Sequence, residues 1–427
     1  MPSQAPSGRS SPQERTGPPG RIEPRLWALF GATFCSMALT MGQITFLGKQ
    51  VFDMTGKPIF LGLLGLAEFV PAFLLAPISG MVADRFERRL VFAWGLSGEA
   101  VASLGLFFYV ASDPASVLPI YGLVVTFGAA RAFLMAVGRA MPVDLAPEGA
   151  RERMVALNVA GWQGGFIVGP VVFGLAFDVD PALPYLLAAG CAAAGIGLLM
   201  IVPPSDVRRA ALASGGDARA VTSQALEGLR YVRRNRVLLG AISLDLFAVF
   251  LGGVHLLLPA IAAERLGVGA VRLGWLTSAV GIGAAAVMLA LSVRPFQRRV
   301  GPSLLGSVAL FGAGTIVLGL TRSYFVAFAA MLVLGGADAV SIFVRGTLVP
   351  LATPEEMRGR VLAVEYVFIG GSNELGGFRS GVTAALLGVA GAVVFGGAGT
   401  LAVVAVWWLV FPELRRIDRF SEASPDT

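Results

Sequence analysis

The sequence predicts an all-α membrane protein in which twelve transmembrane helices form two pseudo-symmetric six-helix bundles. Three observations predict this fold: the composition, the length of the apolar runs and an internal repeat. Hydrophobic residues make up 56% of the 427 residues and charged residues only 14%, whereas soluble domains carry roughly 25% charged residues. Inside lipid the backbone must bond to itself, so apolar runs of about 20 residues indicate membrane-spanning helices.

Six apolar runs lie in each half of the chain, and each is long enough to cross a bilayer. Residues that favour turns, such as Asp53, Pro58, Asp113 and Pro184, separate the runs on one side of the membrane. Arg-rich connections separate them on the other side. The expected spans are 26–50, 60–82, 89–111, 117–138, 153–177, 182–202, 237–262, 273–293, 301–320, 323–346, 359–387 and 389–411.

Two polar segments complete the organisation. Residues 1–25 are rich in Pro, Ser, Gly and Arg without an apolar stretch, which predicts a disordered tail rather than a signal peptide. In the long central connection, Val221, Ala225 and Leu229 recur at helical spacing among arginines, which predicts an amphipathic linker helix lying on the membrane surface. The predicted domains are the N-tail 1–25, the bundle 26–202, the linker 203–236, the bundle 237–411 and the C-tail 412–427.

The distribution of basic residues predicts the orientation. Of the 33 Lys and Arg residues, 26 fall on one side of the predicted spans, five on the other, and two, Arg131 and Arg379, inside spans. Because Lys and Arg are concentrated in cytoplasmic connections, both termini are expected in the cytoplasm. The formal charge of +6 is therefore explained by topology. We expect a multi-pass protein of the bacterial inner (plasma) membrane without a nucleic-acid partner.

The two halves repeat each other in sequence. The segment from Arg139 to Ala156 matches the segment from Arg345 to Ala363, with an offset of 206 that becomes 207 after Thr353. A weaker match, in the same order, relates residues 84–89 to residues 294–299. Two matches at nearly one offset indicate duplication, and two related six-helix halves are what alternating access requires.

The hairpin from Gly80 to Arg89, with Asp84-Arg85 at its centre and Arg88-Arg89 at its end, resembles the 2–3 loop signature of the major facilitator superfamily. Segments that begin at Glu227, Arg345 and Gly371 resemble its bacterial branch of drug and siderophore (enterobactin-exporter-like) permeases. The resemblance extends from about residue 25 to residue 411. The chain departs from it at Glu87, where the family usually has a small residue.

The resemblance implies a secondary active transporter, with proton-coupled export of an amphipathic small molecule, drug-like or siderophore-like, by alternating access. The expected activity is thus efflux by an antiporter. Uptake, transport of lysophospholipids or other lipids, and a non-transporting sensor with the same fold remain alternatives. The expected partners are the small-molecule substrate, protons and the bilayer, and the expected state is a monomer.

Enzymatic and metal-dependent functions find little support in the residues. The chain has a single histidine, His255, and its two cysteines, Cys35 and Cys191, both lie in apolar runs. A His-based triad, a His-rich metal site and a disulfide are therefore not expected. There is no G-x-x-x-x-G-K-[ST] motif, which excludes an ATP-driven pump within this chain. We expect no enzymatic activity, no cofactor and no metal.

The resemblance also implies a gate on the cytoplasmic side. Asp84 would accept hydrogen bonds from the free N–H groups at the start of the eleventh helix, near Arg358, and Arg139 or Arg360 would complete the contact. This contact would break when the protein opens inward. The alternative is a solvated acid in a loop that only sets topology. The residues of the predicted gate are Gly80, Asp84, Arg85, Arg88, Arg89, Arg139 and Arg360.

Charged residues inside the spans are the candidates for coupling or substrate binding, because an unpaired charge in hydrocarbon is expensive. The resemblance implies that helices 1, 4, 7 and 10 line the cavity and that helices 3, 6, 9 and 12 face lipid, so Arg131 and Asp338 are the expected cavity charges. Arg131 either binds an anionic group or tunes an acid, or it forms a static pair with Glu99 or Glu68.

Glu374 lies fifteen residues into its span, where it is either a proton-binding acid or the partner of Arg379 on the same helix. Asp245 and Glu365 lie near the cytoplasmic ends of their spans, so they are expected to reach water, and His255 is expected to be a packing or gate residue. The candidates for coupling or substrate binding are Glu68, Arg131, Trp162, Asp338, Asn373, Glu374 and Arg379.

Overall fold

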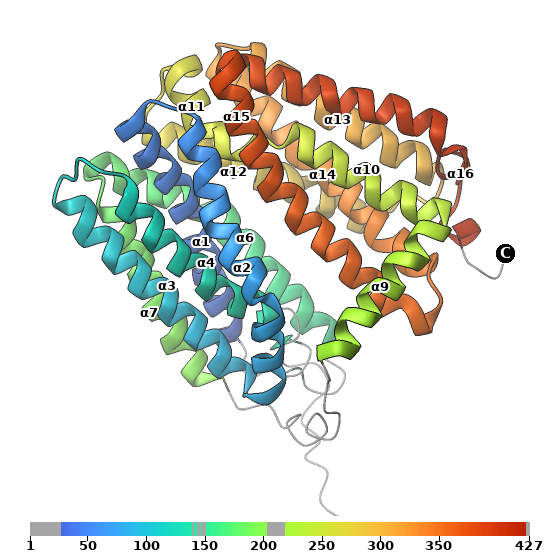
Figure 1. Ribbon diagram of the computed structural model, residues 1–427, viewed down its shortest axis with the longest axis horizontal. Coiled ribbons are helices and arrows are strands. Elements are labelled where there is room, and N and C mark those ends of the chain that lie inside the picture. Colours follow the sequence, from blue (N-terminus) through green and yellow to red (C-terminus); the bar gives the residue numbers. More distant parts are fainter. Residues whose placement is uncertain (1–26, 139–140, 143–145, 147–150, 203–217, 424–427) are drawn as a thin grey trace, which may run out of the picture.

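The computed structural model describes residues 27–138, 141–142, 146, 151–202 and 218–423 (Figure 1). The predicted N-tail, the first part of the central linker and Arg139 lie outside these ranges. Within them, eleven helices are long and apolar enough to cross a membrane. The predicted all-α membrane fold is confirmed.

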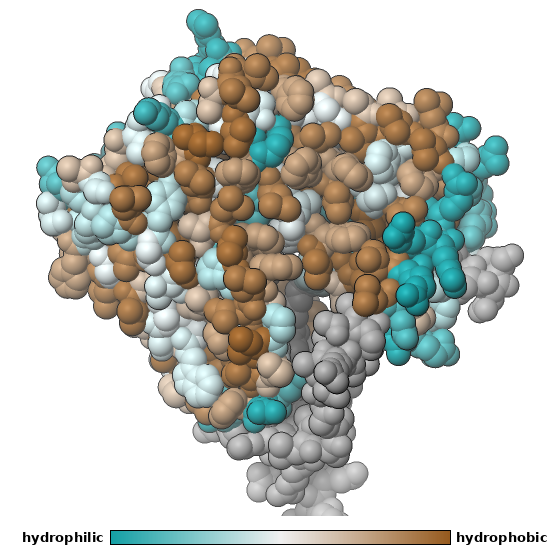
Figure 2. Space-filling model, viewed as in Figure 1, coloured by the Kyte–Doolittle hydropathy of each residue, from teal (hydrophilic) through white to brown (hydrophobic). Residues whose placement is uncertain are grey.

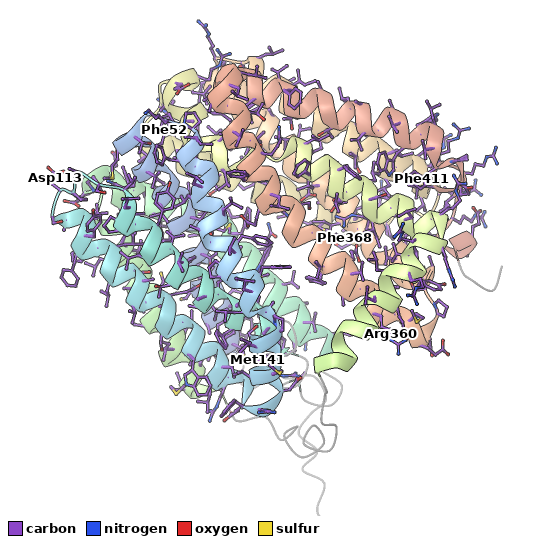
Figure 3. All side chains as sticks on the ribbon, viewed as in Figure 1. Phe52, Asp113, Met141, Arg360, Phe368 and Phe411 are labelled. Carbon is purple, nitrogen blue, oxygen red and sulfur yellow. The ribbon has the colours of Figure 1, made fainter. Side chains whose placement is uncertain are left out.

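The N-terminal bundle contains six of these helices. Its central pair is α1 and α6, α2 packs on α4, and α3 packs on both α4 and α7. Phe52 and Asp113 lie at one end of this bundle and Met141 lies at the other (Figure 3). The helices are α1 (Trp27–Thr55), α2 (Ile59–Arg85), α3 (Arg88–Ala111), α4 (Leu118–Gly138), α6 (Arg151–Val179) and α7 (Leu183–Ile201).

The C-terminal bundle repeats this pattern of neighbours. Here α10 packs on α15, α12 on α14, and α13 on both α14 and α15. The same arrangement in both halves agrees with the duplication read from the sequence. The helices are α10 (Arg236–Gly252), α12 (Ala270–Val293), α13 (Val300–Leu320), α14 (Tyr324–Leu351) and α15 (Glu355–Val410).

The long helix α15 contains two spans. Its 56 residues would extend about 84 Å as one straight helix, far more than the roughly 30 Å of a bilayer core. Gly388 interrupts it with φ 74° and ψ 166°, a backbone conformation that only glycine adopts readily. The chain therefore reverses at Gly388, and the described residues form twelve membrane-spanning segments.

The seventh span is broken, and the prediction of one continuous helix over 237–262 is wrong. Helix α10 ends at Gly252, and the chain continues through η2 (His255–Leu257), α11 (Leu258–Ala260) and the π-helical η3 (Ile261–Leu266). Gly253 has extended φ and ψ of −63° and 113°. The Gly252-Gly253 pair is the local reason, because glycine has the weakest helix propensity after proline.

The two bundles contact each other through α2 on α15 and through α6 on α12. Gly62 and Gly381 let α2 and α15 approach closely: a Cβ on Gly381 would lie 2.9 Å from the Cα of Gly62. Between α6 and α12, Gln163 Nε2 donates to the carbonyl of Gly281 at 2.8 Å. Gly62 and Gly381 lie in the halves of α2 and α15 remote from the Arg-rich segments 85–89 and 294–299, whereas Gln163 and Gly281 lie near the middles of α6 and α12.

We call the end of the molecule with those Arg-rich connections the basic end. The bundles diverge towards it, so the molecule has the outline of a V (Figure 1). On α2, apolar residues of this half are exposed, among them Phe73, Leu74 and Ile78. The molecule is therefore closed at the end opposite the basic end and open towards the basic end.

Helix α9 (Ala218–Arg234) belongs to the C-terminal bundle. Gly228 packs against the backbone of Arg360 at the start of α15, and Val232 is buried beside Val361. Hydrophilic residues gather over this region (Figure 2), where Arg230, Arg233 and Arg234 are exposed. The amphipathic linker helix thus has a packed side and a basic side.

The C-terminal segment, with α16 (Pro412–Arg416) and η4 (Phe420–Ala423), folds back on α13. The N–H of Arg299 donates to Asp418 Oδ1 at 3.0 Å, and the N–H of Gly301 donates to the carbonyl of Ile417 at 3.0 Å. These bonds satisfy donors that a helix start leaves free.

Candidate functional site

An ion pair between α4 and α2 forms the centre of the site. Arg131 Nη1 lies 2.5 Å from Glu68 Oε1, and both side chains are mostly but not fully buried. Glu374 of α15 is close enough to interact electrostatically with both. Its Oε2 lies 3.4 Å from the position that a Cβ of Gly65 would occupy, one turn before Glu68. The structure thus brings together three of the predicted candidates, from both bundles.

A further carboxyl group adjoins this pair. Glu99 of α3 is fully buried and interacts electrostatically with Arg131 and Glu68. Helix 3 was expected to face lipid, but the side chain of Glu99 turns to the interior of the bundle. Of the two static partners considered for Arg131, Glu68 makes the ion pair in the described residues.

Arg379 binds the broken end of α10 instead of a carboxylate. Its Nε donates to the carbonyl of Phe250 at 3.2 Å, and its Nη2 donates to the carbonyl of Leu251. The neighbouring Ser380 Oγ donates to the carbonyl of Gly253 at 2.7 Å. A helix end leaves its last carbonyls free, and a cation is favourable there. The alternative of a pair between Arg379 and Glu374 is therefore not what the described residues form.

A second charged cluster lies in the C-terminal bundle, towards the basic end. Arg345 of α14 is 4% exposed and lies 2.8 Å from Asp245 Oδ1 and 3.3 Å from Glu365 Oε1. The expectation that Asp245 and Glu365 reach water is wrong, since both are buried. Asp338 interacts electrostatically with Asp245 and Arg345, so it belongs to this cluster and not to the one around Arg131.

Sequence reasoning missed Arg345, which was counted among the residues of a cytoplasmic connection. The predicted span ended at 346, whereas α14 continues to Leu351. Residues 347–351 are Thr-Leu-Val-Pro-Leu, mostly apolar, and extending the span over them would have placed Arg345 six residues before its end instead of one, too deep for a residue of a connection.

An apolar cleft of about 350 Å³ lies between the bundles, beside the Arg131 pair. Phe69, Phe73, Phe250 and Phe368 provide its aromatic walls, and Figure 3 marks Phe368 midway along the inner span of α15. Phe69 follows Glu68 directly, so α2 contributes to both the charged pair and the cleft. The remaining lining residues are Leu246, Val367, Gly371, Ser372 and Leu375.

Two predicted candidates have local partners. The ring of Trp162 lies 5.7 Å from that of Phe166 on the same helix, and its side chain is half exposed. Asn373 Nδ2 donates to the carbonyl of Ile369, one turn earlier, at 2.8 Å. His255, at the start of η2, is exposed.

The hairpin at the basic end exposes its acid. Asp84 and Arg85 are exposed, and a Cβ on Gly80 would meet no atom within 4 Å. Arg89 Nε lies 2.5 Å from Glu87 Oε1, and Arg89 Nη1 donates to the carbonyl of Val202 at the end of α7 at 2.6 Å. The side chain of Arg88 is half-buried. The hairpin is therefore anchored to its own bundle through Arg89.

Arg360 has a different partner from the one expected. It pairs with Glu227 of α9, and both side chains are partly exposed. Of the two arginines predicted to complete the contact of Asp84, Arg139 lies outside the described residues. In this conformation Arg360 binds the linker helix.

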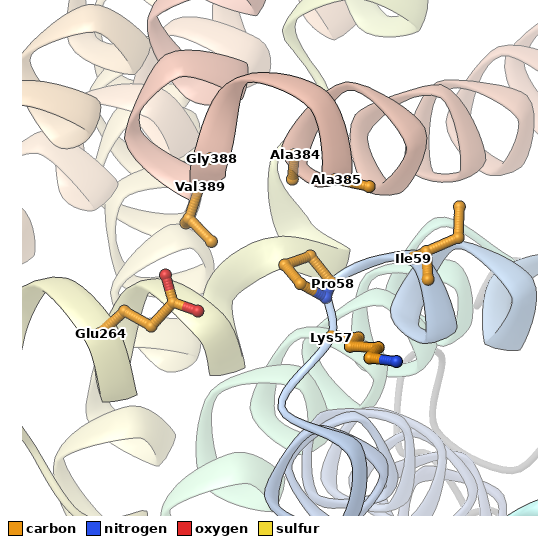
Figure 4. A pocket seen from close by; sticks show the side chains of 8 residues that line it. All are labelled: Lys57, Pro58, Ile59, Glu264, Ala384, Ala385, Gly388 and Val389. Atoms are coloured by element: carbon orange, nitrogen blue, oxygen red, sulfur yellow. The ribbon is translucent and has the colours of Figure 1, made fainter.

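At the closed end, a cavity of about 280 Å³ lies between the start of α2, η3 and the bend of α15. Figure 4 shows the carboxylate of Glu264 turned towards it, while the side chain of Lys57 extends away. The lining residues are Lys57, Pro58, Ile59, Glu264, Ala384, Ala385, Gly388 and Val389.

The chain is similar to known membrane carriers. The family model of the Major Facilitator Superfamily matches residues 29–364. The chain is 25% identical over 378 residues to the enterobactin exporter EntS of Escherichia coli O1:K1 / APEC, which covers 85% of this chain and 83% of that protein.

Solved structures show the same fold. The nucleoside transporter NupG matches with a TM-score of 0.74 at 14% identity, over 91% of this chain and 99% of its own. The inward open conformation of the xylose transporter XylE from E. coli matches with a TM-score of 0.68 at 16% identity, over 93% and 99%.

Proposed function

Because the chain belongs to the Major Facilitator Superfamily, we propose that it is a secondary active transporter that exports an amphipathic small molecule in exchange for protons. One observation carries this proposal. The Glu68–Arg131 ion pair of the first bundle faces Glu374 of the second. When one bundle rocks against the other, the contacts between charges on the two bundles are broken and formed again.

The cleft supports an amphipathic substrate. Its walls are aromatic and aliphatic, and the charges of Glu68, Arg131 and Glu374 lie at its side. An apolar pocket with few polar groups favours a ligand with an apolar body and a polar end. The likeness to the enterobactin exporter makes siderophore-like and drug-like molecules the first compounds to test.

The orientation follows from the positive-inside rule, which puts the basic end and both termini in the cytoplasm of a bacterial cell. The molecule then faces inward here, with its cleft open to the cytoplasm. Opening to the outside requires that α2 and α15 separate near Gly62 and Gly381. In that state Asp84 would contact the start of α15 and close the cytoplasmic side.

Glu374 is the acid that we assign to proton exchange with the cleft. It lies on α15, whose contact with α2 must be made and broken in each cycle. When the bundles separate on the outside, Glu374 moves away from Arg131 and Glu68. Its protonation state is then linked to the conformation, which is the requirement for coupled transport.

Accumulation of a fluorescent drug in cells with and without the gene tests the function. Export predicts lower accumulation with the gene, and the difference should disappear when the proton gradient is collapsed. Higher accumulation would indicate uptake. Equal accumulation for every compound in a broad panel that includes siderophores and lysophospholipids would contradict transport.

A pair of variants tests the role of Glu374. Glu374→Gln should abolish proton-driven export but retain exchange of substrate across the membrane. Glu356→Gln, which changes an exposed acid in the first turn of the same helix, should export normally. Unchanged proton-driven export by Glu374→Gln would contradict this assignment and would mean that another carboxyl group binds the proton.

A further inference from the structure

Glu99 on α3 is the most deeply buried acid of the membrane-spanning region that the structure describes. Its side chain is 0% exposed, and neither carboxyl oxygen has a hydrogen-bond partner among the described residues. A buried polar group without a partner costs about 1–3 kcal/mol, and an ionised one costs more. Buried polar groups in native folds are nearly always hydrogen-bonded, so this exception calls for an explanation.

The charge around Glu99 is unbalanced. Among the described residues Arg131 is the one cation that interacts with it, and Arg131 already pairs with Glu68 at 2.5 Å. Glu374 shares the same cation from the other bundle. With all three acids ionised, the group would carry two negative charges in excess, one of them on a carboxyl group that is fully buried.

The helices packed around Glu99 supply no further cation. On α7, residues 183–201 contain no Asp, Glu, His, Lys or Arg. On α1, Lys49 lies near the end of the helix that is remote from the basic end, and its Nζ pairs with Asp53 Oδ2 at 2.7 Å. The groups that face Glu99 are therefore Arg131 of α4 and Glu68 of α2, with Glu374 of α15 beyond them.

A buried polar contact continues from Glu99 to α1. Ser103 Oγ lies 2.7 Å from the backbone carbonyl of Glu99 and 2.6 Å from Gln43 Oε1. Gln43 is also 0% exposed, and its Nε2 has no partner among the described residues. A hydroxyl has one proton to donate, so Ser103 can satisfy only one of these acceptors at a time.

We propose that Glu99 is a proton-binding site, occupied in this conformation and exchanged through Arg131. A proton on the carboxyl group of Glu99 removes one of the excess negative charges while Arg131 stays on Glu68. When Arg131 leaves Glu68, it becomes free to pair with Glu99. The O–H bond of Glu99 then breaks, the carboxylate pairs with the guanidinium, and the proton passes to water in the cleft.

The proposal rests on the proposed function, in which Glu374 exchanges protons with the cleft. Glu99 adds a second, buried proton-binding site, and its proton exchanges with the cleft only through Arg131. Substrate binding beside Glu68, or the movement of Glu374 with its bundle, is the event that detaches Arg131. The position of Arg131 thus determines whether the carboxyl group of Glu99 is protonated or ionised.

Infrared difference spectroscopy of the purified full-length protein tests this without a substrate, so its result is independent of whether transport is found. The spectrum of the wild type minus that of Glu99→Gln should contain the C=O band of a protonated carboxyl group. The control Glu356→Gln, at an exposed acid, should give no such band. A difference spectrum for Glu99→Gln with only the bands of an ionised carboxylate would overturn the proposal.

A second variant tests whether Arg131 controls the proton of Glu99 or whether Glu99 is only a structural acid that stays protonated. Glu68→Gln removes the partner of Arg131 and should free the guanidinium for Glu99. The protonated-carboxyl band that belongs to Glu99 should then be lost from the Glu68→Gln spectrum. If that band persists at full strength in Glu68→Gln, Arg131 does not control the proton, and the exchange mechanism is refuted.

Discussion

The contact between Gly62 and Gly381 allows a test of the proposed equilibrium between inward-facing and outward-facing molecules, because one added methyl group would disturb it. In Gly381→Ala, the new Cβ would lie 2.9 Å from the Cα and from the N of Gly62, and 3.1 Å from the carbonyl oxygen of Pro58. Carbon atoms prefer separations of about 3.5–4.0 Å, so α2 and α15 must move apart by at least about 0.6 Å. The neighbouring atoms belong to the backbone and cannot rotate away.

The cost of this overlap should be about 1–3 kcal/mol, the usual range for overpacking. In the proposed orientation it applies to the inward-facing state, in which the two helices touch, and is relieved when they separate on the outside. The ratio of outward-facing to inward-facing molecules should therefore rise about 5- to 150-fold.

Cysteine labelling from outside the cell can measure this ratio. The native Cys35 and Cys191, which are both free, are replaced by alanine, and Leu256→Cys supplies the reporter. The side chain of Leu256 packs against Gly65 and Gly377, between α2 and α15. An impermeant thiol reagent should react with it faster in Gly381→Ala than in the parent.

Gly370→Ala is the matched control, because a Cβ at Gly370 on the same helix would meet no atom within 4 Å. Both variants gain the helix propensity of alanine over glycine, so that effect cancels. Equal labelling rates in Gly381→Ala and Gly370→Ala, or slower labelling in Gly381→Ala, would refute the proposal that this contact closes the outer side of the protein.

Three further outcomes are expected. Arg345→Ala leaves Asp245 and Glu365 buried without their cation, which should destabilise the protein by about 3–5 kcal/mol; an unchanged melting temperature in detergent would contradict this. Asp84→Asn should lower transport without changing the amount of protein in the membrane, and normal transport would contradict the role of Asp84 in the cytoplasmic gate. Phe368→Ala removes an aromatic wall of the cleft and should raise the Kd of a transported substrate about 10- to 150-fold, whereas an unaltered Kd would place the substrate elsewhere.

The membrane fold was predictable because apolar runs report directly on the thickness of a bilayer. Even the bend at Gly388, between two spans with no polar residues to separate them, fell between the predicted ends 387 and 389. The break after Gly252 was not predictable in the same way. The hydropathy of this segment indicates only an apolar run. The break is stabilised by Arg379 and Ser380 of α15, which donate hydrogen bonds to the carbonyls that the break leaves free.

The site was predictable in its members but not in their partners. Hydropathy singles out Arg131, Glu68 and Glu374 because charges are rare inside spans. Which acid pairs with which arginine depends on how four helices are rotated about their axes, and sequence spacing does not fix that. The inward turn of Glu99 is an example, since the family pattern assigns its helix to the lipid side.

The C-terminal segment behind α13 has a practical consequence. Asp418 and Ile417 occupy the N–H groups of Arg299 and Gly301, and Leu414 is completely buried. Affinity tags or fluorescent reporters can follow residue 423 without displacing these groups. Shortening the gene after residue 410, where α15 ends, would expose the start of α13 and leave the site of Leu414 unfilled. Expression trials with truncated chains would then report on folding defects rather than on activity.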